Sequence, residues 1–251
     1  MMNTLSCFKR NTYLLLTGLC LLLTTACSKN DNAGPEKTEG EKPAQGSVPF
    51  YKLQRVENFS VETDDKNPTQ AKTAAYYSLE NKAEVMALYA KTARWDVAFN
   101  GLYNSFLSGN NGQDASNLGY GASGAGGIMI VEKPFEQVTS IPSDAEFKTK
   151  GTLVGTDNLG DFGEGTGWYL YDFAGTKRGD GSYNKQHVAY ALPEIRTIIL
   201  RTAAGNYAKI KMISCYKDAF TADRWFRETP HMFFTFEYVL APKGSTKFEI
   251  K

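Results

Sequence analysis

The chain has 251 residues, 42% of them hydrophobic, and its 28 Lys and Arg are almost balanced by 27 Asp and Glu. This near-neutral charge argues against a phosphate-binding surface for nucleic acid, and the length supports one sizeable domain with its own core. Three of the four cysteines fall within the first 27 residues, and the chain contains only two histidines, His187 and His231. We therefore exclude a disulfide framework and a cysteine-built zinc site, and we expect no multi-histidine metal site.

The first 27 residues have the pattern of a cleaved secretory signal. Lys9 and Arg10 precede an apolar run, Tyr13–Leu23, which ends in Thr24–Cys27. A short cationic stretch, about ten apolar residues and small residues at the cut are typical of a signal peptide, and the run is shorter than the roughly 20 residues of a membrane-spanning helix. Because the cysteine follows an alanine and is itself followed by polar sequence, we expect a bacterial lipobox with acylation at Cys27. An uncleaved anchor helix and a soluble secreted protein are the alternatives.

The segment after this cysteine carries almost no large apolar side chain. Residues Ser28–Ser47 are rich in Lys, Glu, Gly, Pro and Asn, a composition that cannot offset the entropy cost of ordering the chain. The sequence therefore predicts a signal peptide over residues 1–26, a lipidated cysteine with a flexible tether over residues 27–48, and a folded β domain over residues 49–251.

From Phe50 onward, short apolar and aromatic segments alternate with Gly, Asn and Asp, and few segments have a helical period. This pattern predicts an all-β fold of predominantly antiparallel sheets with little helix. Residues Asp218–Arg227 are expected to form a short helix or a long loop. The candidate strands are Tyr51–Val61, Ala74–Ser78, Val85–Tyr89, Trp95–Phe99, Ile128–Val131, Thr152–Val154, Trp168–Tyr171, Ala189–Leu192, Thr197–Thr202, Tyr207–Cys215 and Met232–Val239.

The clearest hairpin lies between Thr197–Thr202 and Tyr207–Met212, which flank Ala203–Asn206. Gly and Asn in this connection supply the positive φ that a tight turn needs. On the second strand, polar and apolar residues alternate, so we expect Tyr207, Lys209 and Lys211 on a polar face and Ala208, Ile210 and Met212 on a buried one.

Local structure can also be predicted for two further segments, one from its alternation and one from its glycine content. In Arg94–Asn100, alternation predicts that Trp95, Val97 and Phe99 share a buried face, while Asp96 and Asn100 point elsewhere or bond to a turn. The glycine-rich run Gly119–Gly127 predicts a close backbone approach, or a loop beside a ligand or another strand. It lacks the lysine and the following helix of a phosphate-binding loop.

Several segments in the same order resemble the HmuY family of haem-binding lipoproteins of Bacteroidota. They are RWDVAFN at 94–100, GGIMIVEKPFEQVTSIPSD at 126–144, GWYLYD at 167–172, RTIILRTAAGNYAKIKMISCYKDA at 196–219 and FTFEYVLAP at 234–242. The resemblance covers most of residues 50–242. It implies a mostly β domain, lipid-anchored at the outer membrane, that takes up haem between strands and passes it to a TonB-dependent outer-membrane receptor. Whether it faces the periplasm or the cell surface is left open.

The resemblance also implies where the iron ligands, His or Met in that family, are to be found. One comes from the segment before Gly167, yet Glu146–Gly167 contains neither His nor Met, and the position after the following strand is Phe173. His187 is the nearest replacement, since a neutral imidazole is a good axial ligand, and Met129 is a second candidate. The alternatives are that His187 is an ordinary exposed histidine and that Met129 is a core residue. The remaining candidate ligands are His231 and the tyrosines Tyr169, Tyr171 and Tyr183.

No Ser/His/acid order, paired carboxylate motif or metal triad points to catalysis, so we do not expect an enzyme. Two functions remain. The first is a carrier of haem or a related tetrapyrrole. The second is a surface lipoprotein of the same fold that has lost the iron ligands and binds another ligand or a protein partner, for which Trp225 and Phe226 would supply an exposed contact patch.

Overall fold

The computed structural model describes residues 47–70, 72–151 and 154–251. Within these residues the chain forms eleven strands, six short 3-10 turns and no α-helix. The predicted all-β fold is confirmed. Cys27 and the proposed tether up to residue 46 lie outside the described residues. The strands are β1 (Gln54–Ser60), β2 (Ala75–Ser78), β3 (Ala83–Val85), β4 (Val97–Asn100), β5 (Phe106–Gly109), β6 (Gly127–Val131), β7 (Tyr169–Asp172), β8 (Val188–Ala191), β9 (Thr197–Arg201), β10 (Tyr207–Tyr216) and β11 (His231–Ala241).

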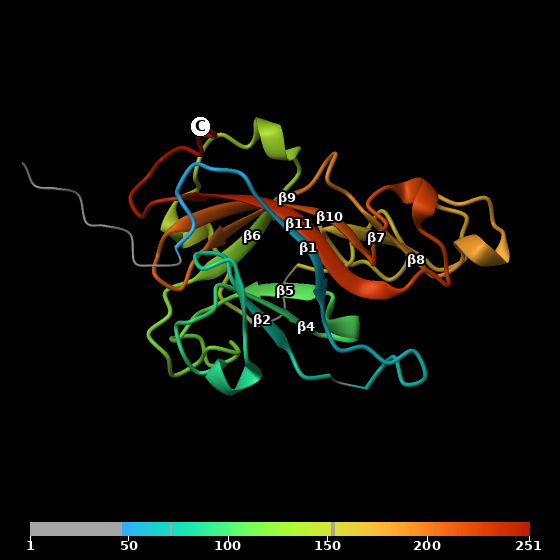
Figure 1. Ribbon diagram of the computed structural model, residues 1–251, viewed down its shortest axis with the longest axis horizontal. Helices are drawn as coiled ribbons and strands as arrows, with labels where there is room; N and C mark the ends of the chain where they lie inside the picture. Colours follow the sequence, from blue (N-terminus) through green and yellow to red (C-terminus); the bar gives the residue numbers. More distant parts are fainter. Residues whose placement is uncertain (1–46, 71, 152–153) are drawn as a thin grey trace, which may run out of the picture. The chain divides into compact units, whose positions relative to one another are not determined.

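The strands form three antiparallel sheets. A five-stranded sheet has the order β1-β11-β10-β9-β6, a four-stranded sheet has the order β3-β2-β4-β5, and β7 pairs with β8 alone. Figure 1 shows the long β10 and β11 lying over the sheet that contains β2, β4 and β5, with β7 and β8 at one end. The 3-10 turns are η1 (Ala87–Tyr89), η2 (Leu102–Asn104), η3 (Phe135–Gln137), η4 (Asp144–Glu146), η5 (Tyr183–Lys185) and η6 (Ala222–Arg224).

An aromatic core fills the space between the two larger sheets. Phe99 from β4 lies 4.7 Å from Phe234 and 5.1 Å from Phe59, ring centre to ring centre, and Tyr77 from β2 lies 5.6 Å from Phe236. All five side chains are at most 5% exposed. Tilted and edge-to-face contacts of this kind add stability beyond the apolar area they bury, which explains the high aromatic content of the chain.

Most predicted strands match observed ones to within a few residues, but two predictions need correction. The predicted strand Val85–Tyr89 is wrong, because β3 ends at Val85 and the chain turns into η1. The strand Phe106–Gly109 was missed, since its Ser and Gly read as loop residues. Of the predicted strand Thr152–Val154, only Val154 is described, and it forms an isolated bridge with Leu107.

The predicted β9–β10 hairpin is confirmed, with Ala208 opposite Leu200 and a positive φ at Gly205. Its predicted polar face is wrong at Tyr207, which is 7% exposed, and at Lys209, which is only 2% exposed. The Lys209 ammonium donates to the carbonyl oxygens of Phe135 and Val138, both at 2.9 Å, and lies 4.3 Å from the Phe135 ring. The segment around η3 covers this face of the sheet, so the charge is buried rather than solvated.

Within the segment Arg94–Asn100, Arg94 is exposed, but residues 95–100 are buried on both faces and not on one. Val97 and Phe99 enter the main core, whereas Trp95 packs with Tyr76 and Ala98 in a separate cluster. Asp96 is 3% exposed and accepts hydrogen bonds from the backbone N–H groups of residues 79, 80 and 203. This carboxylate ties the β2–β3 turn to the β9–β10 turn.

The predicted close approach in the glycine-rich run is confirmed. A Cβ on Gly126 would lie 2.5 Å from the Asn110 carbonyl oxygen and 2.8 Å from that of Arg201. A Cβ on Gly124 would lie 2.5 Å from the Asn110 side-chain oxygen. Since these distances are shorter than any normal contact, only glycine lets this run pack against its neighbours.

Candidate functional site

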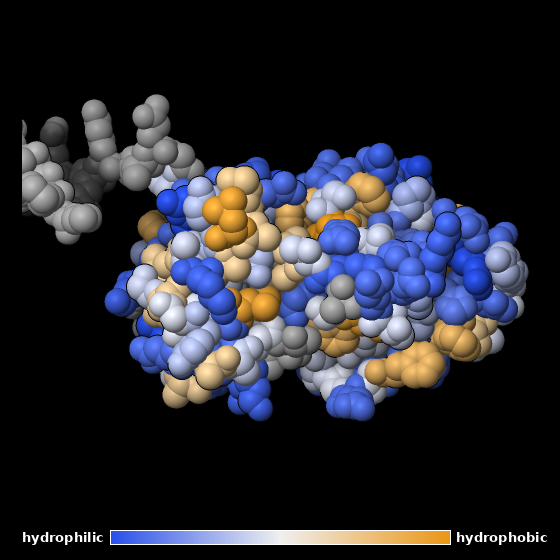
Figure 2. All heavy atoms as spheres, turned by 90° about the horizontal axis from the view of Figure 1, so that it is seen from below, coloured by the Kyte–Doolittle hydropathy of each residue, from blue (hydrophilic) through white to orange (hydrophobic). Residues whose placement is uncertain are grey.

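Four rings gather at the end of the β7–β8 pair and form what we call the aromatic platform: Phe162, Tyr171, Phe173 and His187. The Phe173 ring centre lies 4.7 Å from that of His187 and 5.5 Å from that of Phe162. Phe162 is 77% exposed and Phe173 is 47% exposed. Figure 2 shows hydrophobic side chains gathered near the right-hand end of the face that it displays, the end at which Figure 1 places β7 and β8. Such exposure of apolar rings is a feature of binding surfaces.

Strand pairing positions the two polar members of the platform. Tyr171 pairs with Ala189 across the two-stranded sheet, and His187 directly precedes β8. The backbone N–H of His187 donates to the carbonyl oxygen of Phe173 at 3.2 Å. His187 has a φ of +60°, in the left-handed region that is unusual for a residue other than glycine.

Asp172, which is fully buried, binds the loop between β7 and β8 through hydrogen bonds. One oxygen of its carboxylate accepts the backbone N–H groups of Lys177, Arg178 and Gly179 at 2.9 to 3.2 Å. Although burial alone would raise the pKa of Asp172, these donors hold it below its usual value. The carboxylate therefore stays ionised and fixes the loop that carries Phe173 and leads into His187.

A second loop brings Phe162 to the platform. The Asp161 backbone N–H donates to the Tyr171 carbonyl at 2.7 Å, and the Asp161 carboxylate accepts the Phe173 N–H at 2.9 Å. The base of this loop is fixed by Asp157, whose carboxylate lies 2.7 Å from the Arg196 guanidinium. Burial would raise the pKa of Asp157, but the Arg196 guanidinium and two backbone donors hold it below its usual value.

His187 and Tyr171 are directly bonded: Nδ1 of the imidazole lies 2.7 Å from the phenol oxygen. Burial and the positive charge of Arg227 lower the pKa of His187 below its ordinary 6.5, so the ring is neutral at pH 7. Burial, together with nearby Tyr103, raises the pKa of Tyr171 to about 12, so it remains a phenol. If Nδ1–H donates to Tyr171, the lone pair of Nε2 is free to bind a metal.

Cationic side chains border the platform. The Arg227 guanidinium lies 4.4 Å from the Tyr183 ring centre, and its backbone N–H donates to the Asn184 carbonyl at 2.8 Å. The Lys185 ammonium lies 4.0 Å from the Phe226 ring centre. A ligand lying on the platform would therefore find positive charge beside it.

The other predicted site residues lie outside the platform, although His231 lines the same small pocket as Arg227. Met129 is in β6 and packs against the apolar cluster around Phe147 and Phe248, at a distance from β7 and β8 (Figure 1). His231 begins β11, its Nε2 lies 2.9 Å from the Asp65 carboxylate, and its ring centre lies 6.0 Å from that of Tyr103. Among residues 47–70, 72–151 and 154–251, no group of three or more His, Cys, Asp or Glu side chains could hold a metal ion.

The predicted contact patch at Trp225 and Phe226 is half right. Phe226 is 40% exposed, but Trp225 is only 4% exposed, because its ring stacks on Tyr216 and its indole N–H donates to the Ala219 carbonyl. Sequence reasoning missed Phe162 and Arg227. Both lie in loops whose position depends on hydrogen bonds to distant residues, so the local sequence carries no signal for them.

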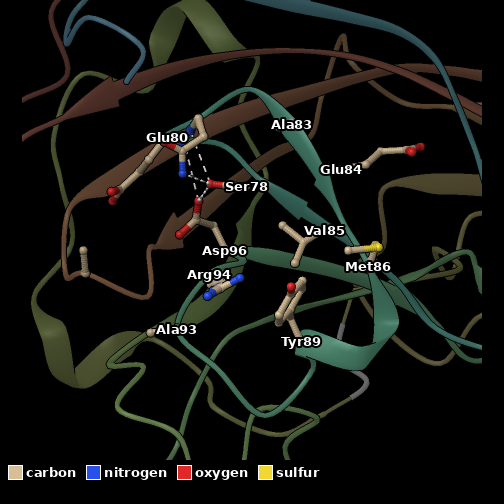
Figure 3. A pocket seen from close by; sticks show the side chains of 12 residues that line it. Ser78, Glu80, Ala83, Glu84, Val85, Met86, Tyr89, Ala93, Arg94 and Asp96 are labelled. Carbon is tan, nitrogen blue, oxygen red and sulfur yellow. Dashed lines mark hydrogen bonds between the residues drawn. The ribbon is translucent and has the colours of Figure 1, made fainter. Parts of the chain in front are cut away.

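A cavity of about 320 Å³ lies between the β2–β3 turn, η1 and the β9–β10 turn. Glu80 and Asp96 contribute carboxylates to its lining and Arg94 a guanidinium, while the side chain of Glu84 points away from it (Figure 3). Such a charge distribution would disfavour an anionic ligand, so this cavity is a poorer candidate site for such a ligand than the aromatic platform.

The fold and the platform define the class: an all-β protein with an exposed aromatic surface that carries a single histidine. A family model described as HmuY protein matches residues 70–227, which is more than half of the chain. The chain belongs to the HmuY family. The match includes all four residues of the platform and Arg227, and stops before His231. A search of curated proteins found no match to the chain, and no helix within the described residues has both the length and the apolar character to span a membrane.

Proposed function

We propose that this protein is an outer-membrane lipoprotein, anchored through acylated Cys27, that binds haem or a related tetrapyrrole and passes it to a TonB-dependent receptor. The observation that carries the proposal is the exposed aromatic platform with a neutral histidine at its edge. Membership of the HmuY family supports the same function. The protein acts as a carrier and not as an enzyme.

The platform suits a flat, apolar macrocycle. The Phe162 and Phe173 rings are perpendicular to one another, at 84°, so one would present its face and the other its edge to the macrocycle, and Nε2 of His187 would coordinate the iron. Arg227 and Lys185 would attract the two propionates. Because Phe162 and Phe173 are still substantially exposed, the ligand would remain accessible from one side, as transfer to a receptor requires.

Titration with haemin, followed by absorbance, tests the proposal. The wild-type chain should give a sharp Soret band that saturates at one equivalent, and His187→Ala should shift this band and weaken binding. Phe162→Ala with Phe173→Ala should weaken binding without removing the iron–imidazole signature. His231→Ala is the matched control, because His231 is held by Asp65 and lies outside the platform. A wild-type spectrum indistinguishable from that of free haemin would exclude haem binding.

The second function is that of a surface lipoprotein which binds another ligand or a protein partner. The exposure of Phe162 favours it, because a fully apolar ring left 77% in water is also typical of a protein-docking surface. If haemin does not bind, the platform variants should instead reduce binding to a partner captured from the same cell envelope.

The proposed anchor has its own test. Metabolic labelling with a radioactive fatty acid should label the wild-type chain but not Cys27→Ser, and the variant should leave the membrane fraction. Acylation at this cysteine would supply the two or more chains that stable anchoring needs. Labelling of Cys27→Ser would place the lipid elsewhere.

A further inference from the structure

Strand β7 pairs with β8 along one edge, and the loop of residues 157–166 lies against the other edge. The Asp161 backbone N–H donates to the Tyr171 carbonyl oxygen at 2.7 Å. A Cβ on Gly160 would lie 2.6 Å from the Tyr171 backbone nitrogen, so only glycine lets the loop come this close to the strand. Phe162 directly follows this point of attachment along the chain.

The Asp161 side chain binds the other loop of the platform, the one between β7 and β8. One carboxylate oxygen accepts the Phe173 N–H at 2.9 Å, and the other lies 3.6 Å from the Lys177 ammonium. The Asp161 side chain is 28% exposed and that of Lys177 is 42% exposed, and an ion pair at such a surface position contributes little to the stability of a fold. We therefore expect the main effect of Asp161 to be on the relative position of the two loops.

The Phe173 backbone continues this connection to the histidine. Its N–H donates to Asp161, and its carbonyl oxygen accepts the His187 N–H at 3.2 Å. Phe162 and His187, at the two ends of this series of bonds, both have a positive φ, of +63° and +60°. For a residue other than glycine, such a backbone conformation persists only where the surrounding contacts impose it. The hydrogen bonds on either side of Phe173 are contacts of that kind.

The position of the Phe162 ring depends on its loop more than on its side-chain contacts. The ring centre lies 5.5 Å from that of Phe173 and 6.2 Å from that of Tyr171, and Phe162 is 77% exposed. Because so much of the ring faces water, neighbouring side chains do little to orient it. A change in the attachment of the loop should therefore move Phe162 relative to Phe173 and His187.

We propose that Asp161 is a positioning residue of the aromatic platform. Its carboxylate couples Phe162 to Phe173 and, through the Phe173 backbone, to His187. The inference rests on the proposed function, since it takes the ligand of the platform to be haem or a related tetrapyrrole. A ligand that meets three rings already in place loses less free energy to ordering of the protein. Asp161 acts through these neighbours and does not itself contact the ligand.

Hydrogen exchange on the full mature chain tests the coupling without any ligand. In Asp161→Ala the Phe173 amide loses its acceptor and should exchange about tenfold faster. The His187 amide should also exchange faster, although its own acceptor is the Phe173 carbonyl and not Asp161. Asp161→Asn keeps an oxygen that can accept the Phe173 N–H, so it should stay close to wild type. Unchanged exchange at the His187 amide in Asp161→Ala would overturn the coupling.

Haemin titration of the same variants tests the role in ligand binding. Asp161→Ala should bind haemin about tenfold more weakly than wild type, and Asp161→Asn within about threefold, while the midpoint of urea unfolding stays the same in all three. Glu164→Ala is the matched control, since it removes an exposed carboxylate from the same loop, and it should match wild type in both exchange and affinity.

Wild-type haemin affinity in Asp161→Ala, or an equal loss in Asp161→Ala and Glu164→Ala, would overturn the positioning role. If the wild-type chain binds no haemin, the proposed function fails, whereas faster exchange at Phe173 and His187 in Asp161→Ala would still support the coupling of the three rings by Asp161.

Discussion

The phenol oxygen of Tyr171 lies 2.7 Å from Nδ1 of His187, although the two residues are 16 positions apart in the chain. The link exists because β7 and β8 are antiparallel neighbours, with Tyr171 opposite Ala189. It determines which imidazole nitrogen is available to a ligand. When Nδ1 carries the proton and donates it to Tyr171, Nε2 keeps a free lone pair. Tyr171 is thus a positioning residue for the proposed iron ligand.

Removal of this link should weaken haem binding without abolishing it. Tyr171→Phe keeps the ring and loses the hydroxyl, so the imidazole is free to rotate. Loss of a partner that orients a metal-binding histidine typically costs about 10- to 100-fold in affinity, and we expect a loss in that range together with a shifted Soret band. Tyr183→Phe is the control, because Tyr183 contacts Arg227 and not His187. Equal affinity of Tyr171→Phe and wild type would show that Tyr171 does not orient the ligand.

Haem binding should be lost in acid at a pH set by His187. Iron binds the neutral imidazole, and burial together with Arg227 lowers the pKa of His187 below 6.5. Ligation should therefore be complete at pH 7 and disappear only as the pH falls below about 6.5, when protonation competes with iron. The Soret band, followed from pH 8 to pH 4, measures this transition. His187→Ala should lack it, and Arg227→Met should move it to higher pH. A midpoint above pH 7 would contradict the assignment.

The sequence was sufficient to predict the all-β fold, because strands and turns have short-range signals. Alternation predicted β10, and Gly205 with Asn206 predicted its turn. Alternation failed at Lys209, where the polar side chain has the period of an exposed face yet lies under η3. What covers that face is a segment some 70 residues earlier in the chain, and no local pattern reports such a contact.

The sequence predicted less of the candidate site than of the fold. His187 could be singled out because only two histidines exist, but its partner Tyr171 was one of several equivalent tyrosines. Phe162 reaches the platform because the Asp161 backbone bonds to Tyr171 of β7 and the Asp161 side chain bonds to Phe173, which directly follows β7. Those bonds depend on the position of the whole loop, which is set in turn by the buried pair of Asp157 and Arg196.

Substitution of either member of the Asp157–Arg196 pair should destabilise the domain strongly. Asp157 is fully buried and Arg196 is 9% exposed. Removal of one partner from a buried ion pair leaves an uncompensated charge and typically costs about 3–5 kcal/mol. We expect Arg196→Met to lower the free energy of unfolding in urea by about this amount, and Asp157→Asn with Arg196→Met to lose less than the sum of the single changes.

Arg178→Met supplies the control for this measurement, since Arg178 pairs with Glu194 at the surface, where both side chains are at least 41% exposed. Exposed pairs contribute about 0–1 kcal/mol, so this variant should be close to wild type. A similar loss in Arg178→Met and Arg196→Met would show that burial of the Asp157–Arg196 pair has no special effect.

Lys209 should stabilise the domain through its two carbonyl partners rather than through an ion pair. Its ammonium is buried, burial lowers its pKa, and both of its hydrogen bonds are to backbone oxygens of the segment around η3. Lys209→Met keeps the apolar stem but leaves the carbonyls of Phe135 and Val138 without this donor. A buried polar group that loses its partner costs about 1–3 kcal/mol, while removal of a buried cation is itself favourable. We therefore expect a net loss of about 2 kcal/mol in urea unfolding.

The amides around η3 should also exchange faster in Lys209→Met, because the Lys209 ammonium binds this segment to β10. Lys211→Met is the matched control: Lys211 is two positions along the same strand, is 22% exposed and pairs with Glu237 at 2.9 Å near the surface. It should lose less than about 1 kcal/mol, as is usual for such a pair. Because Lys211 also lies 3.5 Å from the exposed Glu136 carboxylate of η3, Lys211→Met should speed exchange there less than Lys209→Met does. If Lys209→Met were as stable as wild type, the gain from removing the buried charge would equal the cost of the two lost hydrogen bonds, and the ammonium would serve to position η3 without stabilising the fold.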